Sequence, residues 1–365
     1  MYFSQRGHDV VGADNYFRRN ASTELDCEPL IPAANLIQRA RIWEELTGKK
    51  ISVHIGDITD YGFLLSLFRD YRPDAVIHYA EQPSAPYSMM NREKAAFTLR
   101  NNLLSTLNIA YAVKESNPHC HIIKLGTMGE YGTPNIDIEE GWLEIEHKGR
   151  RDTFLFPRQA SSLYHTTKIQ DTDLLWFYVR MWGLRVTDLM QGPVYGISTD
   201  ESDLDDRLTT FFNYDEIFGT VLNRFITQAV SGYPLTVYGE GGQTRGYLNI
   251  RDTMQCVYLS AEKPAATGEL RVFNQVTETF SVNDLAQKVQ KTGCELGYDV
   301  RINRIENPRK EKEAHYYAPR YTGLLEIGLQ PHYLNDEALQ GMFSIVGKHK
   351  DRINRDAIFR GIKWK

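Results

Sequence analysis

The sequence lacks the features that mark membrane and secreted proteins. No apolar run approaches the roughly 20 residues needed to cross a bilayer, and the mean hydropathy is −0.44. We therefore expect no membrane insertion. The first residues, MYFSQRGHD, show no basic segment followed by an apolar core. A secretory signal is therefore not visible, and we expect a cytoplasmic protein.

An excess of positive charge is also missing. Lys and Arg number 42 against 47 Asp and Glu, which gives a net charge of −5. This balance offers no long-range attraction for a polyanion, so we expect no nucleic acid partner. The four cysteines lack the two-residue spacing of a zinc knuckle, and we expect free thiols and no metal site. They are Cys27, Cys120, Cys256 and Cys294.

The first half of the chain contains an alternation of short β-branched runs and longer helical patterns. Residues 60–71 and 95–116 carry apolar side chains at helical spacing. Such alternation is typical of parallel strands joined by crossover helices. We predict an α/β fold with a Rossmann-type, doubly wound parallel sheet. Its strands are expected at residues 9–14, 51–55, 75–79 and 121–125.

The pattern changes after Gly192, where an acidic run and a Gly-rich stretch follow. We expect residues 1–192 to form the sheet domain, which also receives part of 252–278. Residues 193–365 are expected to form a smaller C-terminal α/β domain for the substrate. Helices are predicted at 221–231 and 282–293, a strand at 272–274, and a long loop at 18–32.

The start of the chain resembles the end of a dinucleotide-binding unit. In such a unit a strand, a Gly-rich turn and a helix precede a second strand, which ends at an acidic residue for the adenosine ribose. Gly7 matches the end of the helix and Asp14 the acidic residue, yet no Gly-x-Gly-x-x-Gly precedes them. We expect the first strand and the turn to lie upstream of Met1. Taken alone, Asp14 fits a strand end without a cofactor equally well.

Tyr164 and Lys168 stand four positions apart and would share one face of a helix. The positive charge of Lys168 would favour the phenolate and lower the pKa of Tyr164 toward that of a catalytic base. This pattern is common by chance. Its place, about 35 residues after a strand that ends in Thr127, favours function because the carboxyl ends of parallel strands hold ligands.

Together these motifs resemble the extended short-chain dehydrogenase/reductase superfamily of nucleotide-sugar enzymes. Within it, the chain is similar to the UDP-sulfoquinovose synthases at residues 82–89, 125–141 and 237–252. The likeness runs from about Gly7 to Trp364. The superfamily motifs are Asp14, Gly56-Asp57-Ile58, residues 78–82, Asn101-Asn102, Thr127, Tyr164 with Lys168, and residues 245–252.

The resemblance implies conversion of UDP-glucose and sulfite to UDP-6-sulfoquinovose through a 4-keto-5,6-ene, with NAD as internal hydride carrier. Tyr164 would take the proton of the sugar 4-hydroxyl, Lys168 would lower the pKa of Tyr164 and hold the nicotinamide ribose, and Thr127 would bond the 4-oxygen. Related 4,6-dehydratases carry Asp-Glu after the threonine, where this chain has Met128-Gly129. Simple dehydration is therefore disfavoured.

His165 and Glu130 are candidates for proton transfer at C5 and C6. A helix-surface histidine and a structural hydrogen bond, respectively, are the alternatives. The resemblance also implies a homodimer that forms through helix 95–116 and the helix after Tyr164.

The resemblance also implies the ligand contacts. An acid at Asp14 favours NAD over NADP, although Arg18 and Arg19 are close enough to accept a phosphate. Arg245 and Arg309 match the arginines for the diphosphate. The cofactor residues are Asp14, Asn15, Asp57, Ile58, Ala80, Glu81, Gln82, Asn102, Leu125, Tyr164, Lys168, Gln191 and Val194. The substrate residues are Thr127, Tyr164, Gln191, Asn223, Arg224, Thr236, Tyr238, Gln243, Arg245, Asn274 and Arg309.

Two alternatives stay open. A UDP-glucose 4-epimerase, or another NAD-dependent nucleotide-sugar epimerase or dehydratase, would need no sulfite. A non-catalytic relative that only binds a nucleotide sugar would explain the missing Gly-rich turn. The presence of Thr127, Tyr164 and Lys168 argues against the second alternative, because a protein that only binds has no chemical need for them.

Overall fold

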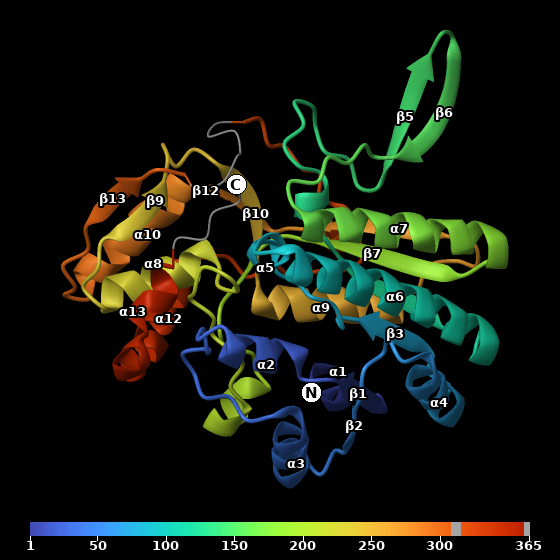
Figure 1. Ribbon diagram of the computed structural model, residues 1–365, viewed down its shortest axis with the longest axis horizontal. Helices are drawn as coiled ribbons and strands as arrows, with labels where there is room; N and C mark the ends of the chain where they lie inside the picture. The colour runs from blue at the N-terminus through green and yellow to red at the C-terminus, as the bar shows by residue number, and fades with distance from the viewer. Residues whose placement is uncertain (308–314, 361–365) are drawn as a thin grey trace.

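The computed structural model describes residues 1–307 and 315–360. A four-stranded parallel sheet in the order β11-β7-β4-β3 forms its centre, which confirms the predicted fold class (Figure 1). Thr127 lies opposite Gln191, and Gln191 opposite Gln275, so the carboxyl ends of three strands meet at one edge. The strands are β3 (Ala75–His78), β4 (His121–Thr127), β7 (Arg185–Gln191) and β11 (Leu270–Gln275).

Helices cover both faces of this sheet. Successive side chains of a strand point to opposite faces, so each strand contributes side chains to two cores. Ile122 of β4 packs in one core with residues of α6 (Arg92–Ser116) and α7 (Leu163–Trp182). Its neighbour Ile123 packs in a second core with residues of α9 (Ile250–Glu262). The sheet is therefore doubly wound, with α4 (Tyr61–Tyr71) beside α6.

Strands β1 (Val10–Asp14) and β2 (Ile51–Ile55) pair with each other in parallel, separately from the central sheet. In the described part of the chain, the second edge of β1 and the outer edge of β3 have no strand partner. A short helix, α1 (Tyr2–Gln5), precedes β1, and the chain leaves it through Gly7 at a φ of +90°. This agrees with Gly7 as the end of a helix.

The segment predicted as a long loop begins instead with a helix, α2 (Phe17–Glu24), so that prediction was wrong in part. Its charged residues hide any apolar period, and the helix is held by tertiary contacts such as the Arg18 guanidinium over the ring of Phe218. Helix α3 (Leu36–Thr47) follows. It carries a capping box between Asn35 and Gln38, a signal that the sequence does contain.

An antiparallel hairpin, β5 (Trp142–His147) and β6 (Arg150–Leu155), extends away from the body of the molecule (Figure 1). Its two-residue turn, Lys148-Gly149, has positive φ at both positions, as such turns require. The sequence analysis did not predict this hairpin.

The second half of the chain builds a core of its own, which residues of the first half such as Tyr87 join. Strands β9 (Leu235–Tyr238) and β13 (Ile302–Ile305) pair in parallel beside α8 (Val221–Val230), α10 (Val282–Glu295) and α12 (Asp336–Lys348). A sheet of β12 (Glu278–Ser281), β10 (Thr244–Asn249) and β8 (Val194–Tyr195) accompanies them. The remaining elements are α5 (Ala85–Met89), α11 (Gly323–Glu326), α13 (Arg355–Ile358) and 3-10 turns at Met128–Glu130, Ser202–Leu204, Asp206–Leu208 and Lys350–Arg352.

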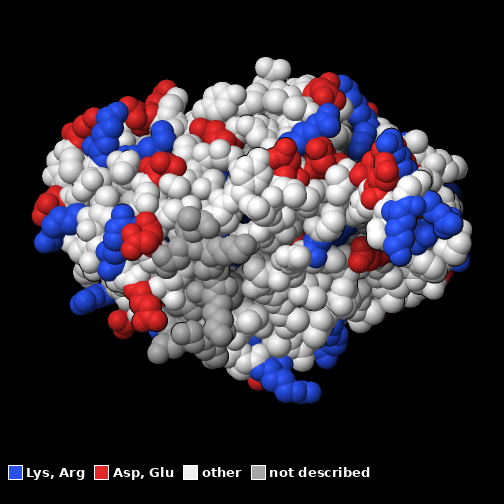
Figure 2. Space-filling view, turned by 90° about the horizontal axis from the view of Figure 1, so that it is seen from above, with Lys and Arg blue, Asp and Glu red and all other residues white. Residues whose placement is uncertain are grey.

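The backbone crosses between the two cores at Gly192, directly after β7. A Cβ atom there would clash with the carbonyl group of Gly246, so this close approach requires glycine. Acidic and basic side chains lie next to one another on the face shown in Figure 2. Within the described residues, no helix has both the length and the apolar character needed to span a bilayer.

Candidate active site

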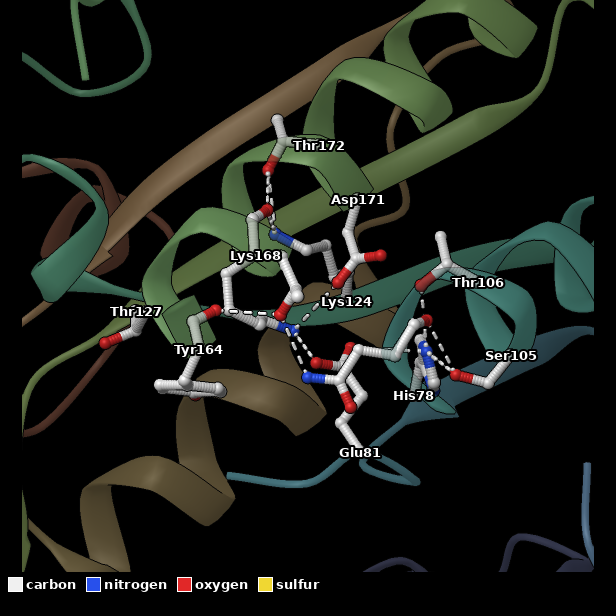
Figure 3. Close-up of polar contacts among 12 residues, drawn as sticks. His78, Glu81, Ser105, Thr106, Lys124, Thr127, Tyr164, Lys168, Asp171 and Thr172 are labelled. Carbon is white, nitrogen blue, oxygen red and sulfur yellow. Dashed lines mark hydrogen bonds and ion pairs between the residues drawn. The ribbon is translucent and has the colours of Figure 1, made fainter. Parts of the chain in front are cut away.

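The start of helix α7 is fixed against the turn that follows β4. Thr127 ends β4, and the ring of His165 lies against Gly129, where any side chain would clash with the imidazole. The backbone N–H of Tyr164 donates to Ser88 Oγ at 3.1 Å, which ties α7 to α5. Tyr164 and Lys168 on α7 therefore lie at the carboxyl end of the parallel sheet, where ligands bind in such folds (Figure 3).

Lys168 is buried in a nest of acidic groups. Its ammonium group donates directly to the Glu81 carboxylate and lies 3.7 Å from Asp171 (Figure 3). Burial opposes the charge, but Glu81 and then Asp171 outweigh it and raise the pKa of Lys168. The other oxygen of Glu81 lies 3.2 Å from His78 Nε2. Burial and the cations Lys168 and Lys124 lower the pKa of His78, so that imidazole is neutral.

The pKa of Tyr164 differs from the expected lowering. Burial of the ring raises it, and the negative charges of Glu81 and Glu130 raise it further. Burial is the largest cause of this rise, and Lys168 is engaged by Glu81, so its positive charge does not offset the rise. In this structure Tyr164 is a neutral phenol.

A second buried ion-pair network lies under Thr127, and the sequence analysis missed it. Lys124 in the middle of β4 is fully buried and pairs with Asp188 at 3.0 Å and Glu130 at 3.4 Å. It also donates to Thr172 Oγ1 at 2.7 Å (Figure 3). The available signal was a lysine and an aspartate inside two strands that otherwise read as buried, since buried charges occur in pairs.

Glu130 binds the backbone of Thr127 and so fixes its position. Its Oε1 accepts the backbone N–H of Thr127 at 3.2 Å, and its Oε2 pairs with Arg158 at 3.1 Å. Burial raises the pKa of Glu130, Lys124 opposes the rise and Asp188 adds to it. With both oxygens engaged, the structural hydrogen bond is the alternative that this geometry favours. The Nδ1 of His165 lies 3.0 Å from Ser161 Oγ.

The residues predicted for the adenosine end of the cofactor gather at the carboxyl ends of β1 and β2. Asn15 donates to Asp57 at 3.0 Å, and Asp14 accepts the backbone N–H of Tyr16 at 2.6 Å. Burial opposes ionisation of Asp57, but hydrogen bonds from Thr59 and Asn15 lower its pKa. Asp14 and Asp57 are exposed carboxylates, which suits them to accept the hydroxyls of a ribose.

The remaining cofactor candidates lie between the sheet and α7. Asn102 accepts the backbone N–H of Gln82 at 2.8 Å and donates to Thr167 at 3.0 Å, which joins the segment after β3 to α7. Ala80 is exposed beside Glu81, whereas Gln82 is fully buried and donates to Ser84 and Thr98. Three more occupy regular positions: Ile58 is buried after β2, Leu125 lies in β4 and Val194 in β8.

Several substrate candidates gather in the second half of the chain. The guanidinium of Arg224 lies 4.9 Å from the ring of Tyr238, and Gln243 donates to the Tyr238 carbonyl at 3.3 Å. Arg224 Nε and Gln243 Oε1 are buried without a hydrogen-bond partner in the described residues. Buried polar atoms are normally satisfied, so this arrangement fits a polar ligand between the two side chains.

The other substrate candidates are engaged within the fold. Gln191 donates to Thr253 at 2.6 Å, and the Asn274 amide binds Tyr131 and the Arg320 carbonyl. Arg309 lies outside the described residues. The last three have these contacts: Asn223 donates to the Asn213 carbonyl, Thr236 accepts from Gln228, and Arg245 lies 3.1 Å from His315.

Comparison with known proteins adds to this geometry. Residues 1–274 match the model of the NAD dependent epimerase/dehydratase family. A protein of Spinacia oleracea, "UDP-sulfoquinovose synthase, chloroplastic", is 49% identical over 365 residues, which are 100% of this chain and 76% of that protein. The chain belongs to the UDP-sulfoquinovose synthases of this family. The UDP-sulfoquinovose synthase of Sulfolobus acidocaldarius is 43% identical over 368 residues, 100% of this chain and 93% of that protein.

Solved structures share the fold of this UDP-sulfoquinovose synthase family member at low identity. The UDP-glucuronic acid 4-epimerase of Bacillus cereus, in complex with UDP-glucuronic acid and NAD, has a TM-score of 0.69 at 18% identity and covers 95% of this chain and 93% of its own. The UDP-glucose 4-epimerase of Thermotoga maritima with UDP-glucose has a TM-score of 0.67 at 19% identity, with coverages of 94% and 92%. These likenesses confirm the fold.

Proposed function

We propose that this protein is an NAD-dependent enzyme that converts UDP-glucose and sulfite to UDP-6-sulfoquinovose. The observation that carries the proposal is the identity of 49% and 43% to two UDP-sulfoquinovose synthases over the full length of this chain. The position of Thr127, Tyr164 and Lys168 at the carboxyl end of the sheet supports it.

NAD, when bound, would supply the reversible hydride acceptor that oxidation at C4 of the sugar needs. The exposed carboxylates of Asp14 and Asp57 fit the adenosine ribose. Lys168 and Asn102 fit the nicotinamide end, because a buried cation and a buried amide lie beside Tyr164 there.

Tyr164 removes the proton of the 4-hydroxyl, and Thr127 donates a hydrogen bond to the same oxygen. Tyr164 can act as a base only when Lys168 turns its charge from Glu81 toward the phenol, since the Glu81 pair raises the pKa of Tyr164. Oxidation at C4 makes the C5 proton acidic. Loss of that proton and of the C6 hydroxyl as water gives the 4-keto-5,6-ene.

Bisulfite completes the reaction. Its sulfur forms a bond to C6 while C5 regains a proton, and return of the hydride to C4 is matched by return of the proton from Tyr164. The sum is UDP-glucose plus bisulfite giving UDP-6-sulfoquinovose plus water. His165 is the proposed proton carrier at C5 and C6, because its ring lies against Gly129 in the turn after Thr127. Glu130 instead positions Thr127.

The second half of the chain holds the nucleotide. Arg224, Tyr238 and Gln243 offer a guanidinium, a ring and an unsatisfied amide oxygen in one cluster. Arg245 supplies a further cation for the diphosphate. Residues 193–365, without the part of 252–278 that returns to the sheet domain, form the substrate domain of this proposal.

A homodimer through α6 and α7 is part of the proposal. The two helices pack against each other and expose large apolar side chains: Tyr111 is 36%, Phe177 46% and Met181 59% accessible. Covering such side chains with a second copy would remove apolar surface from water. A cytoplasmic location also belongs to the proposal.

The test is incubation of the protein with UDP-glucose and sulfite, with mass detection of the sugar nucleotide. We expect a sulfonated product. Conversion of UDP-glucose to UDP-galactose without sulfite would replace the proposal with the epimerase alternative. Bound UDP-glucose without any turnover would favour the non-catalytic alternative.

A further inference from the structure

A cavity of about 280 Å³ lies away from Tyr164. It is enclosed by α2, by the loop that follows α2, by residues 211–213 of the second half of the chain and by Arg352 near the C-terminus. Three arginines, Arg18, Arg19 and Arg352, line it together with a single acidic residue, Glu28. The reaction proposed above does not use any of them.

Neutral groups position the three guanidinium groups. Arg19 donates to the Ala33 and Ala34 carbonyls at 3.0 and 3.2 Å. Arg352 donates through Nε to the Leu30 carbonyl at 3.0 Å. Each of these contacts uses only some of the N–H donors of the guanidinium group. Each also binds an arginine to the loop that lines the cavity.

Arg18 lies deepest. It donates to Ser22 Oγ at 3.0 Å, and its guanidinium stacks 3.2 Å from the centre of the Phe218 ring. Burial lowers the pKa of Arg18 to about 10, and the buried carboxylate of Asp215 partly opposes this, so the group stays charged at neutral pH.

The cavity therefore has an excess of positive charge. Among the described residues, no carboxylate lies within 4 Å of the guanidinium of Arg18, Arg19 or Arg352. Glu28, which accepts a hydrogen bond from Thr23 at 3.1 Å, and Asp215, whose charge acts on Arg18, offset part of this positive charge. Guanidinium groups with unused donors, lining one cavity, match the chemistry of a compact oxyanion.

We propose that this arginine cavity binds a compact sulfur or phosphorus oxyanion, and that its ligand is sulfite, the second substrate. The assignment to sulfite rests on the proposed function, which needs an anionic nucleophile in addition to the sugar nucleotide. Contacts link the cavity to the catalytic residues: Phe218 stacks on Tyr87 of α5, and α5 holds Tyr164 through Ser88. These contacts join Arg18 in the cavity lining, through Phe218 and α5, to the helix that carries Tyr164.

The test uses two variants that remove charge but keep an N–H donor, Arg19→Gln and Arg352→Gln. Arg352→Lys keeps the charge and serves as the rescue variant. Arg301→Gln is the matched control, because Arg301 is an exposed arginine paired with Asp299 far from the cavity lining. Circular dichroism and the melting temperature of each variant check the fold.

Two readouts are measured at constant ionic strength. Calorimetry gives the Kd of sulfite and of phosphate for the full chain, and steady-state assays give KM for sulfite and for UDP-glucose. Loss of one charge-assisted contact predicts a rise of about tenfold in the Kd and KM of sulfite for Arg19→Gln and Arg352→Gln. We expect kcat and the KM of UDP-glucose to stay unchanged, and Arg352→Lys to recover most of the loss.

Three outcomes would overturn the inference or part of it. Equal Kd values for Arg352→Gln and Arg301→Gln would refute the oxyanion site. Phosphate binding that sulfite does not displace, with unchanged KM for sulfite, would reassign the cavity to a phosphate-bearing ligand; a titration with NADP then tests a 2′-phosphate. Absence of sulfonated product from the unmodified protein would refute the proposed function, whereas the calorimetry would still decide the oxyanion site.

Discussion

Replacing Glu81 with glutamine should turn Tyr164 into a stronger base. The carboxylate of Glu81 holds the ammonium of Lys168 and is the largest charged contribution to the raised pKa of Tyr164. Glutamine keeps the size of the side chain and removes its charge. Lys168 then keeps only Asp171, at 3.7 Å, as a nearby anion in place of its direct contact with Glu81.

The size of the effect follows from the charges that change. An unscreened cation within about 4–6 Å lowers the pKa of an acid by about one to three units, each worth about 1.4 kcal/mol. Loss of the Glu81 charge acts in the same direction, because like charge disfavours the phenolate. We therefore expect the pKa of Tyr164 to fall by about one to three units in Glu81→Gln.

Loss of the Glu81 charge also affects the stability of the fold. Removing one partner of a buried ion pair costs about 3–5 kcal/mol when the other charge is left alone. Here Asp171 lies 3.7 Å from Lys168 and can take over as partner. Burial and then Glu81 raise the pKa of Asp171, so loss of Glu81 lets Asp171 ionise. We expect the loss to stay below that range.

The assay is the pH dependence of kcat/KM for UDP-glucose, with Glu93→Gln on the exposed start of α6 as control. Activity should rise with pH to a plateau, and its midpoint should lie about one to three units lower in Glu81→Gln than in the control. An unchanged or higher midpoint would refute the reasoning. A higher dissociation constant for NAD with an unmoved midpoint would instead make Glu81 a cofactor contact only.

Three further changes test the site and the core. Gly129→Ala should displace the His165 ring and lower kcat at least tenfold with little change in melting temperature, whereas unchanged kcat removes His165 from the reaction. Lys124→Met should lower the free energy of unfolding by about 3–5 kcal/mol, measured in urea, because it leaves the buried carboxylate of Asp188 without its ion-pair partner, while Glu130 keeps Arg158. Burial, then Arg271 and Arg185, lower the pKa of His121 to about 3, so its contribution to stability is full above pH 6.5 and is lost as pH falls toward 3. Between pH 6.5 and about pH 4, the free energy of unfolding of His121→Gln should therefore fall by roughly 3 kcal/mol less than that of the unmodified protein. An equal fall in both proteins would contradict this.

The strands and main helices could be predicted from sequence because their periods are local. The run 51–55 is β2 to the residue, and 121–125 is most of β4. Helix α2 was missed, because its polar residues carry no apolar stripe and its stability comes from contacts distant in sequence, such as Arg18 with Phe218. Propensity cannot reveal such support.

The candidate site shows the same division. The spacing of Tyr164 and Lys168 is a local signal, and both lie on one helix as predicted. The partner of Lys168 is Glu81, 87 positions away, and no pattern in the sequence joins them. Burial of the ring and then the charge of Glu81 reverse the expected direction of the Tyr164 pKa, so the electrostatic state of the site depends on the tertiary structure.

The return of β11 to the central sheet has a consequence for synthesis of the chain on the ribosome. Strand β7 ends at Gln191, and its outer neighbour β11 begins only at Leu270. At 5–20 residues per second, a nascent chain would carry an uncovered β7 edge for about 4–16 s. An exposed edge strand invites pairing with another chain, so this interval is when a chaperone would protect the growing protein and when a translational pause would most promote aggregation.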